Sequence, residues 1–272
     1  MPRAKQTTLE VEFAELSDTG PTRAGNEDFI GHSAPAKPEE ARTRGWLFAL
    51  ADGVGGHACG EVASRTAVES ALAGFHSAAA GEQLLTLLPR LVQQANSEVH
   101  DAGLKGQAEA GRSMATTIVL CALRYDRMVV AHVGDSRCYL IRAGRIQQLT
   151  NDHTVANEQG RMGVLTGSAA ESMKHVLSRS LGSGLFVNPD VSEHTTLPGD
   201  TFLLCSYGLH GAMPDGEIAT VVSHGKDLAA AARELVAIAN ECDGGDNVSV
   251  QLVRVRGVER VGMYRGRPYL LR

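Results

Sequence analysis

Five acidic residues share a sequence context that favours metal chemistry: Glu27, Asp28, Asp52, Asp135 and Asp246. Each lies at the expected end of a strand or close to glycine. Carboxylates are costly to bring together unless a cation neutralises them. Oxygen ligands without paired cysteines or a His-x-x-x-His motif favour magnesium or manganese over zinc. Each residue alone also fits an ordinary surface turn, so the prediction rests on the whole set.

The segment 46–57 is the centre of this pattern. An apolar run over 46–50 predicts a buried strand, and Asp52, Gly53, Gly55 and Gly56 follow it. Helical spacing resumes near Glu61. We therefore expect a corner between strand and helix with Asp52 at its tip, where glycines allow the backbone to approach a ligand closely.

The remaining pattern predicts one α+β domain in which helices cover antiparallel sheets. Short breaks between apolar runs indicate antiparallel meanders, because parallel crossovers need a dozen or more residues. Segments 34–44 and 106–113 are expected to be loops, and 151–184 a mobile, partly helical excursion. The other expected strands are 11–16, 29–30, 116–123, 128–133, 138–141, 146–149, 201–205 and 247–255, and the expected helices are 61–75, 82–99 and 227–240.

Composition excludes several classes of protein. The net charge of -5 and the lack of a basic stripe before the C-terminal residues argue against nucleic-acid binding. Five widely spaced cysteines argue against a disulfide framework or a structural zinc site. We read no signal peptide at the N-terminus and no membrane span, so we expect a cytoplasmic protein.

The sequence resembles the metal-dependent protein phosphatase 2C family in its bacterial form. The resemblance spans residues 17 to about 255 and rests on five motifs in the family's order. These are Arg23-x-x-Asn26-Glu27-Asp28, Ala51-Asp52-Gly53-x-Gly55-Gly56-His57, Gly134-Asp135-Ser136-Arg137, Leu203-Leu204-Cys205-Ser206-x-Gly208-Leu209 and Gly245-Asp246-Asn247. It implies a sandwich of two antiparallel sheets flanked by helix pairs. It also implies hydrolysis of phosphoserine and phosphothreonine by a metal-activated water.

The resemblance implies a role for each matching residue. Asp52 would bridge two manganese or magnesium ions, Gly53 would offer its carbonyl to one of them, and Asp246 would bind the other. Glu27 would hold a metal-bound water, and Asp135 would contribute to a third, weaker metal site. Two cations sharing a carboxylate suit this chemistry, since they lower the pKa of a water between them.

Arg23 would bind the substrate phosphate, because a guanidinium suits bidentate phosphate contacts. The resemblance further implies a monomeric enzyme acting on phosphorylated proteins, the substrates of a bacterial serine/threonine kinase. The phosphatase domain would cover 9–256. The segment 257–272 would be a basic tail, solvated or able to dock an acidic partner.

Position 207 departs from the family pattern, because Tyr207 stands where the family has a metal-binding aspartate. A neutral phenol is a poor ligand for magnesium. Asp215 and His210 are close in sequence, but the sequence does not show that either reaches the site. The alternative hypothesis is therefore a pseudophosphatase that binds phosphoproteins without turnover.

Three further residues are candidates for chemistry, but each also has a simpler structural explanation. His57 and His153 are candidates for acid–base chemistry, but a lone histidine near glycines is more often a structural hydrogen-bonding residue. Cys59 has no activating partner in the sequence, so we expect an inert thiol.

Overall fold

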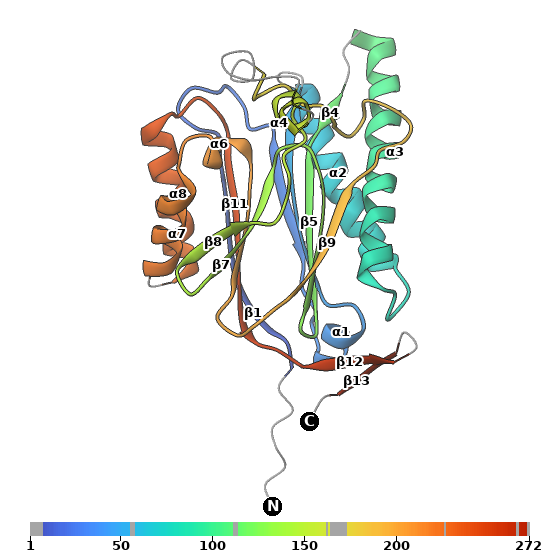
Figure 1. Ribbon diagram of the computed structural model, residues 1–272. Helices are drawn as coiled ribbons and strands as arrows, with labels where there is room; N and C mark the ends of the chain where they lie inside the picture. The colour runs from blue at the N-terminus through green and yellow to red at the C-terminus, as the bar shows by residue number, and fades with distance from the viewer. Residues whose placement is uncertain are drawn as a thin grey trace, which may run out of the picture.

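Two antiparallel sheets pack face to face, with helices on both outer faces, in this computed structural model (Figure 1). The structure describes residues 8–54, 58–110, 114–161, 163, 173–225, 227–264 and 267–270. This arrangement confirms the predicted α+β sandwich. Among the described helices, none combines the length and apolarity needed to cross a bilayer.

The first sheet has five strands in the order β1-β11-β10-β7-β8. Its central strand β10 is buried along its whole length, because one face of the sheet meets the other sheet and the other face meets helices. The expected strands at 11–16, 138–141, 146–149, 201–205 and 247–255 all belong to it. The strands are β1 (Glu10–Asp18), β7 (Arg137–Arg142), β8 (Arg145–Gln148), β10 (Thr201–Cys205) and β11 (Val248–Gly257).

The second sheet has six strands, ordered β2-β3-β5-β6-β9, with the short β4 paired to β3. The predicted strand over 116–123 is divided here into β4 and β5. The strands are β2 (Asp28–Ser33), β3 (Trp46–Val54), β4 (Ala115–Thr116), β5 (Ile118–Arg124), β6 (Arg127–Val133) and β9 (Asp190–Thr195).

Three apolar layers hold the sandwich together. The layer between the sheets includes Phe48, Met128 and Phe202, all without exposed surface. Helices α2 (Ala58–Ser77) and α3 (Leu84–Ala110) cover the six-stranded sheet. Helices α7 (Asp215–His224) and α8 (Leu228–Cys242) cover the other sheet, and Asp227 caps α8 by accepting the N–H of Ala230 at 2.6 Å.

Several sequence expectations are wrong in detail. The loop expected over 34–44 contains helix α1 (Pro38–Thr43), and α3 continues to Ala110 through part of the expected loop at 106–113. The expected meander is interrupted, because β6 and β7 belong to different sheets. Gly134 lies at this crossing with a φ of 104°, a conformation that glycine adopts readily.

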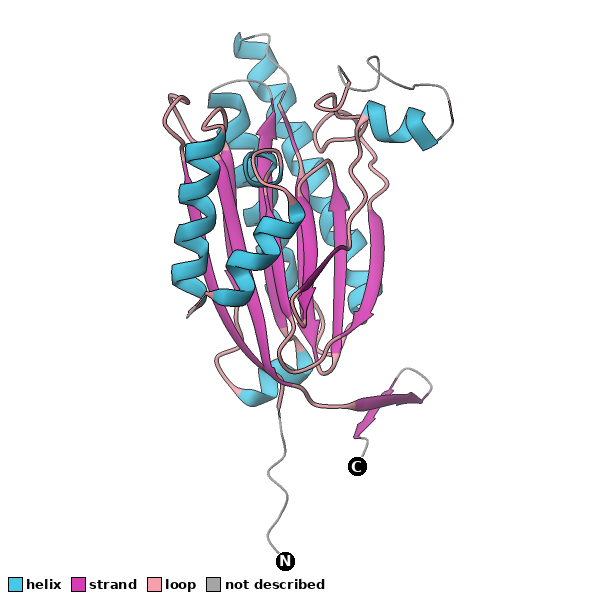
Figure 2. Ribbon diagram, turned by 60° about the vertical axis from the view of Figure 1, so that its left-hand side comes forward, coloured by secondary structure: helices cyan, strands magenta, loops and turns pink. Residues whose placement is uncertain are grey.

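The residues after β11 form a hairpin of β12 (Val261–Tyr264) and β13 (Arg267–Leu270), not a simple tail. Figure 2 shows this hairpin lying apart from the sandwich, at the end where α1 lies. Glu259, just before it, is buried and accepts hydrogen bonds from Nε of Arg42 at 2.8 and 3.1 Å. This ion pair ties the start of the hairpin to α1.

Candidate metal centre

The predicted acidic residues meet at one end of the sandwich, the end where β4 and α6 (Tyr207–His210) lie at the top of Figure 1. All of them except Asp28, which pairs with Asp52, line a cleft of about 830 Å³, here called the carboxylate cleft. Its lining includes Arg23, Glu27, Asp52, Asp135, Tyr207 and Asp246. Residues far apart in the sequence thus come from both sheets to one place.

Asp52 lies inside strand β3, because the strand continues to Val54 and does not turn at the carboxylate. The expected tip of a corner is therefore wrong. Thr117 fixes this part of the strand, since its Oγ1 accepts the N–H of Asp52 and its own N–H donates to the Asp52 carbonyl, each at 2.9 Å. On the other side Asp28 pairs directly opposite Asp52.

Glycine is needed where β3 passes the first turn of α2. A Cβ on Gly53 would lie 2.3 Å from the carbonyl oxygen of Gly60 and 2.7 Å from that of Glu27. A Cβ on Gly60 would lie 2.4 Å from Oε2 of Glu27. The two glycines therefore leave room for the Glu27 carboxylate beside Gly53.

Asn247 organises the loops around Asp246, a role that the sequence did not reveal. Its Oδ1 accepts the N–H of Glu27 at 2.8 Å, and its Nδ2 donates to the carbonyls of Thr19 and Gly25 at 2.8 and 3.0 Å. Its own N–H donates to Oδ1 of Asp246 at 2.9 Å. One amide side chain thus holds the Glu27 loop against the Asp246 loop.

Arg23 lies at the mouth of the cleft with its side chain 46% exposed. Its Nη2 lies 2.9 Å from Oδ1 of Asp246, and its Nε donates to the Gly245 carbonyl at 3.0 Å. The guanidinium is held in place while remaining accessible to an anion.

Burial disfavours the charged forms of several acidic residues in and beside the cleft. Burial raises the pKa of Asp28 to about 7 and that of Asp135 to about 6. Burial also raises the pKa of Asp52 well above its usual range, and the charges of Asp28 and Asp135 add to this rise. Oδ2 of Asp28 is buried and accepts no hydrogen bond from the described residues. These features fit a divalent cation bound by carboxylate oxygens.

Tyr207 occupies the wall of the cleft where the family pattern has an acid. Its N–H donates to Oδ2 of Asp52 at 3.4 Å, so position 207 adjoins the Asp52 carboxylate. Its ring meets those of His175 and His210 edge-on, with centroids 5.1 and 5.2 Å apart. Asp215 accepts the hydroxyl of Tyr139 at 3.0 Å instead of replacing the missing acid.

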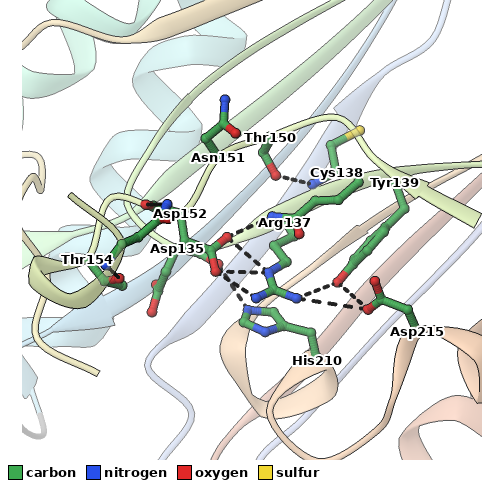
Figure 3. A network of polar contacts seen from close by, with 12 residues as sticks. Asp135, Arg137, Cys138, Tyr139, Thr150, Asn151, Asp152, Thr154, His210 and Asp215 are labelled. Carbon is green, nitrogen blue, oxygen red and sulfur yellow. Dashed lines mark hydrogen bonds and ion pairs between the residues drawn. The ribbon is translucent and has the colours of Figure 1, made fainter. Parts of the chain in front are cut away.

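A second cleft, also of about 830 Å³, shares Asp135, His175 and Tyr207 with the carboxylate cleft. Figure 3 shows the polar network on its wall. Arg137 donates to both carboxylate oxygens of Asp152 at 2.6 to 3.1 Å and to the Tyr139 hydroxyl at 2.7 Å. The network holds the segment after β8 against the start of β7.

His132, His153 and Asp190 form another group with metal-ligand spacing, their ligand atoms lying within 4.8 Å of one another. Arg179 already supplies a cation there, with Nη1 2.9 Å from Oδ1 of Asp190. Nδ1 of His153 accepts the N–H of Gly134 at 3.2 Å, so its Nε2 carries the proton and faces Asp190. We interpret this group as structural, which agrees with the expectation that His153 is a structural hydrogen-bonding residue.

The other two candidates for chemistry are His57 and Cys59. His57 lies outside the described residues. Cys59 is a free thiol at the start of α2, and all five cysteines are free, which confirms that no disulfide framework exists.

The pKa of His210 falls to about 4 through burial and the nearby Arg137 charge, so its ring is neutral at pH 7.

Comparisons with known proteins agree with this geometry. The family model described as protein phosphatase 2C matches residues 16–248. The chain is 34% identical to protein phosphatase PhpP of Streptococcus pneumoniae over 251 residues, covering 89% of this chain and 97% of that protein. The Mycobacterium tuberculosis serine/threonine phosphatase PstP/Ppp has a similar structure, with a TM-score of 0.78, 32% identity and coverage of 91% and 99%. A PstP catalytic domain in complex with two manganese ions matches with a TM-score of 0.76, 33% identity and coverage of 92% and 100%.

Proposed function

Because this chain belongs to the protein phosphatase 2C family and is a metal-dependent protein serine/threonine phosphatase, we propose that the carboxylate cleft is its active site. The observation that carries this proposal is the convergence of Asp52, Asp135 and Asp246 in one cleft, with Asp28 paired opposite Asp52 and its Oδ2 without a hydrogen-bond partner among the described residues. The family uses manganese or magnesium, and oxygen ligands of this kind suit both ions.

Asp52 is the central metal-binding residue in this proposal, because the charges of Asp28, Asp135 and Asp246 all act on its carboxylate. Gly53 with its carbonyl, Asp246 and Asp135 complete the ligand set, with Asp135 at the weakest site. When bound, the cations supply a strong nucleophile at neutral pH and neutralise the phosphoryl oxygens. Glu27 orients a water, and its place beside Gly60 keeps its carboxylate next to Gly53.

Arg23 binds the substrate phosphate. Its guanidinium is exposed at the mouth of the cleft and is oriented by Asp246 and the Gly245 carbonyl. A planar fork of N–H donors matches two phosphate oxygens better than an ammonium group does.

The presence of Tyr207 favours a metal site of weakened affinity over a loss of catalysis. The phenol removes one carboxylate from a cleft that keeps Glu27, Asp52, Asp135 and Asp246. The similar proteins are named as phosphatases, which favours catalysis over the pseudophosphatase alternative.

We further propose that the substrates are proteins phosphorylated by a bacterial serine/threonine kinase. The enzyme acts as a cytoplasmic monomer, with the phosphatase domain over 9–256 and the hairpin of β12 and β13 outside it. Membership of the family supports this assignment.

The test is hydrolysis of p-nitrophenyl phosphate with manganese by Asp52→Ala. We expect activity to fall to background, because water cannot replace a carboxylate shared by two cations. Asp101→Ala on the exposed face of α3 is the matched control and should keep full activity. Full activity in Asp52→Ala would remove the proposed metal centre.

A further inference from the structure

Helix α6 is a single turn that joins two of the acidic segments. At its first residue the N–H of Tyr207 donates to Oδ2 of Asp52 at 3.4 Å. At its last residue Nε2 of His210 lies 3.0 Å from the main-chain carbonyl oxygen of Asp135. A carbonyl only accepts, so Nε2 of His210 must carry the proton.

We infer that His210 is a positioning residue that fixes the main chain of Asp135 and thereby holds its carboxylate towards Asp52. This inference rests on the proposed role of Asp135 as a metal ligand. His210 acts through its hydrogen bond to the Asp135 carbonyl.

The residues before and after Asp135 are held by other groups, whereas the Asp135 carbonyl accepts a hydrogen bond from His210. Gly134 donates its N–H to Nδ1 of His153 at 3.2 Å and accepts the His153 N–H at 2.9 Å. The Ser136 hydroxyl bonds that of Thr117 at 2.7 Å. Among the described residues, His210 makes the hydrogen bond that holds the peptide group between these two anchors.

Arg137 cannot take over this role. Its guanidinium is committed to Asp152 and to the Tyr139 hydroxyl, as Figure 3 shows. If His210 is removed, the Asp135 carbonyl loses its donor, while the hydrogen bonds of Gly134 and Ser136 hold only the residues on either side of it. Partners that orient a metal ligand are typically worth about 10- to 100-fold in metal affinity.

The experiment is calorimetric titration of the metal-free protein with manganese. His210→Leu should weaken the binding event that depends on Asp135 about 10-fold or more, and Asp135→Asn identifies that event by removing it. His210→Gln, whose side-chain amide can donate near the position of Nε2, should recover most of the affinity. His224→Leu is the matched control, since the exposed His224 also bonds a main-chain carbonyl, that of Thr220 at 2.9 Å, and it should bind as the native chain does.

Native affinity in His210→Leu, or equal losses in His210→Leu and His210→Gln, would overturn the inference while Asp135 keeps its role. An unchanged titration in Asp135→Asn would instead overturn the proposed metal ligand. Thermal unfolding in EDTA separates misfolding from weak binding. If the His210 variants do not fold, the ¹⁵N spectrum of the native imidazole decides the question, because a proton on Nδ1 contradicts the hydrogen bond and one on Nε2 supports it.

Discussion

Replacing Asp28 by asparagine should stabilise the metal-free protein, although the aspartate belongs to the family motif. Burial raises the pKa of Asp28 to about 7 from its ordinary value of 3.8. The folded protein therefore holds a proton that the unfolded chain has already released. Ionising Asp28 thus destabilises the fold, and this effect is absent below about pH 4 and complete above about pH 7.

The size of the effect follows from that pKa. At about 1.4 kcal/mol per pH unit, the ionised carboxylate costs on the order of 4 kcal/mol at neutral pH, and roughly 2 kcal/mol of this is relieved between pH 7 and pH 5. Asp28→Asn keeps the shape and removes the charge. The gap in unfolding free energy between variant and native protein should therefore be large at pH 7 and shrink by roughly 2 kcal/mol at pH 5.

Urea unfolding in EDTA measures this gap, with the fluorescence of Trp46, the only tryptophan, as the probe. Burial lowers the pKa of His132, His153 and His210, which makes acid unfavourable for the fold. These histidines are common to variant and native protein, so their contribution cancels in the difference. Manganese should narrow the gap, because a bound cation neutralises the carboxylates.

A control variant, Asp101→Asn, changes an exposed aspartate of α3 and should show no gap at either pH. The reasoning is refuted if Asp28→Asn is less stable than the native protein at pH 7 in EDTA. A gap of the same size at pH 5 and pH 7 would refute it equally, because the effect would then have nothing to do with ionisation.

Three further outcomes are expected. Arg23→Ala should raise the Michaelis constant for p-nitrophenyl phosphate about 10-fold with little change in turnover, because the arginine binds a group present in both ground and transition states; a fall in turnover alone would contradict this role. Tyr207→Asp should strengthen or add a manganese-binding event in calorimetry and raise turnover, since a carboxylate is restored beside Asp52; no change in either would mean that another acid fills the role. Arg142→Met should lower the free energy of unfolding in urea by roughly 2 kcal/mol, because it leaves the charge of the buried Asp200 without its ion-pair partner. The partial exposure of Arg142 keeps this loss below that expected for a fully buried pair. Unchanged stability would mean that the ion pair contributes nothing.

The sequence predicted the central strands and the acidic site because both depend on local patterns. The apolar run over 46–50 is long enough to specify a buried strand, and the glycines beside Asp52 and Asp246 mark close backbone approach. The extension of β3 to Val54 could not be predicted, because it depends on pairing with Ala115 and Thr116, more than sixty residues away.

Strand β9 and the role of Asn247 were missed for different reasons. Strand β9 is polar and half-exposed and, among the described strands, pairs with β6 alone, so it lacks the alternation that reveals a strand. Asn247 looks like an ordinary residue after Asp246, and its contacts to Thr19 and Gly25 exist only once both loops are in place. The raised pKa of Asp28 likewise depends on burial that no local pattern encodes.

The position of the acidic residues also determines how a bound cation would connect the two sheets. Asp28 and Asp52 come from the six-stranded sheet, while Asp246 precedes a strand of the five-stranded sheet and Asp135 lies where the chain crosses between them. Any cation held by these residues therefore cross-links the two sheets at the end opposite the hairpin. Chelation then removes the cross-link at one end only, while the apolar layer around Phe48 and Phe202 keeps the sheets together along their length.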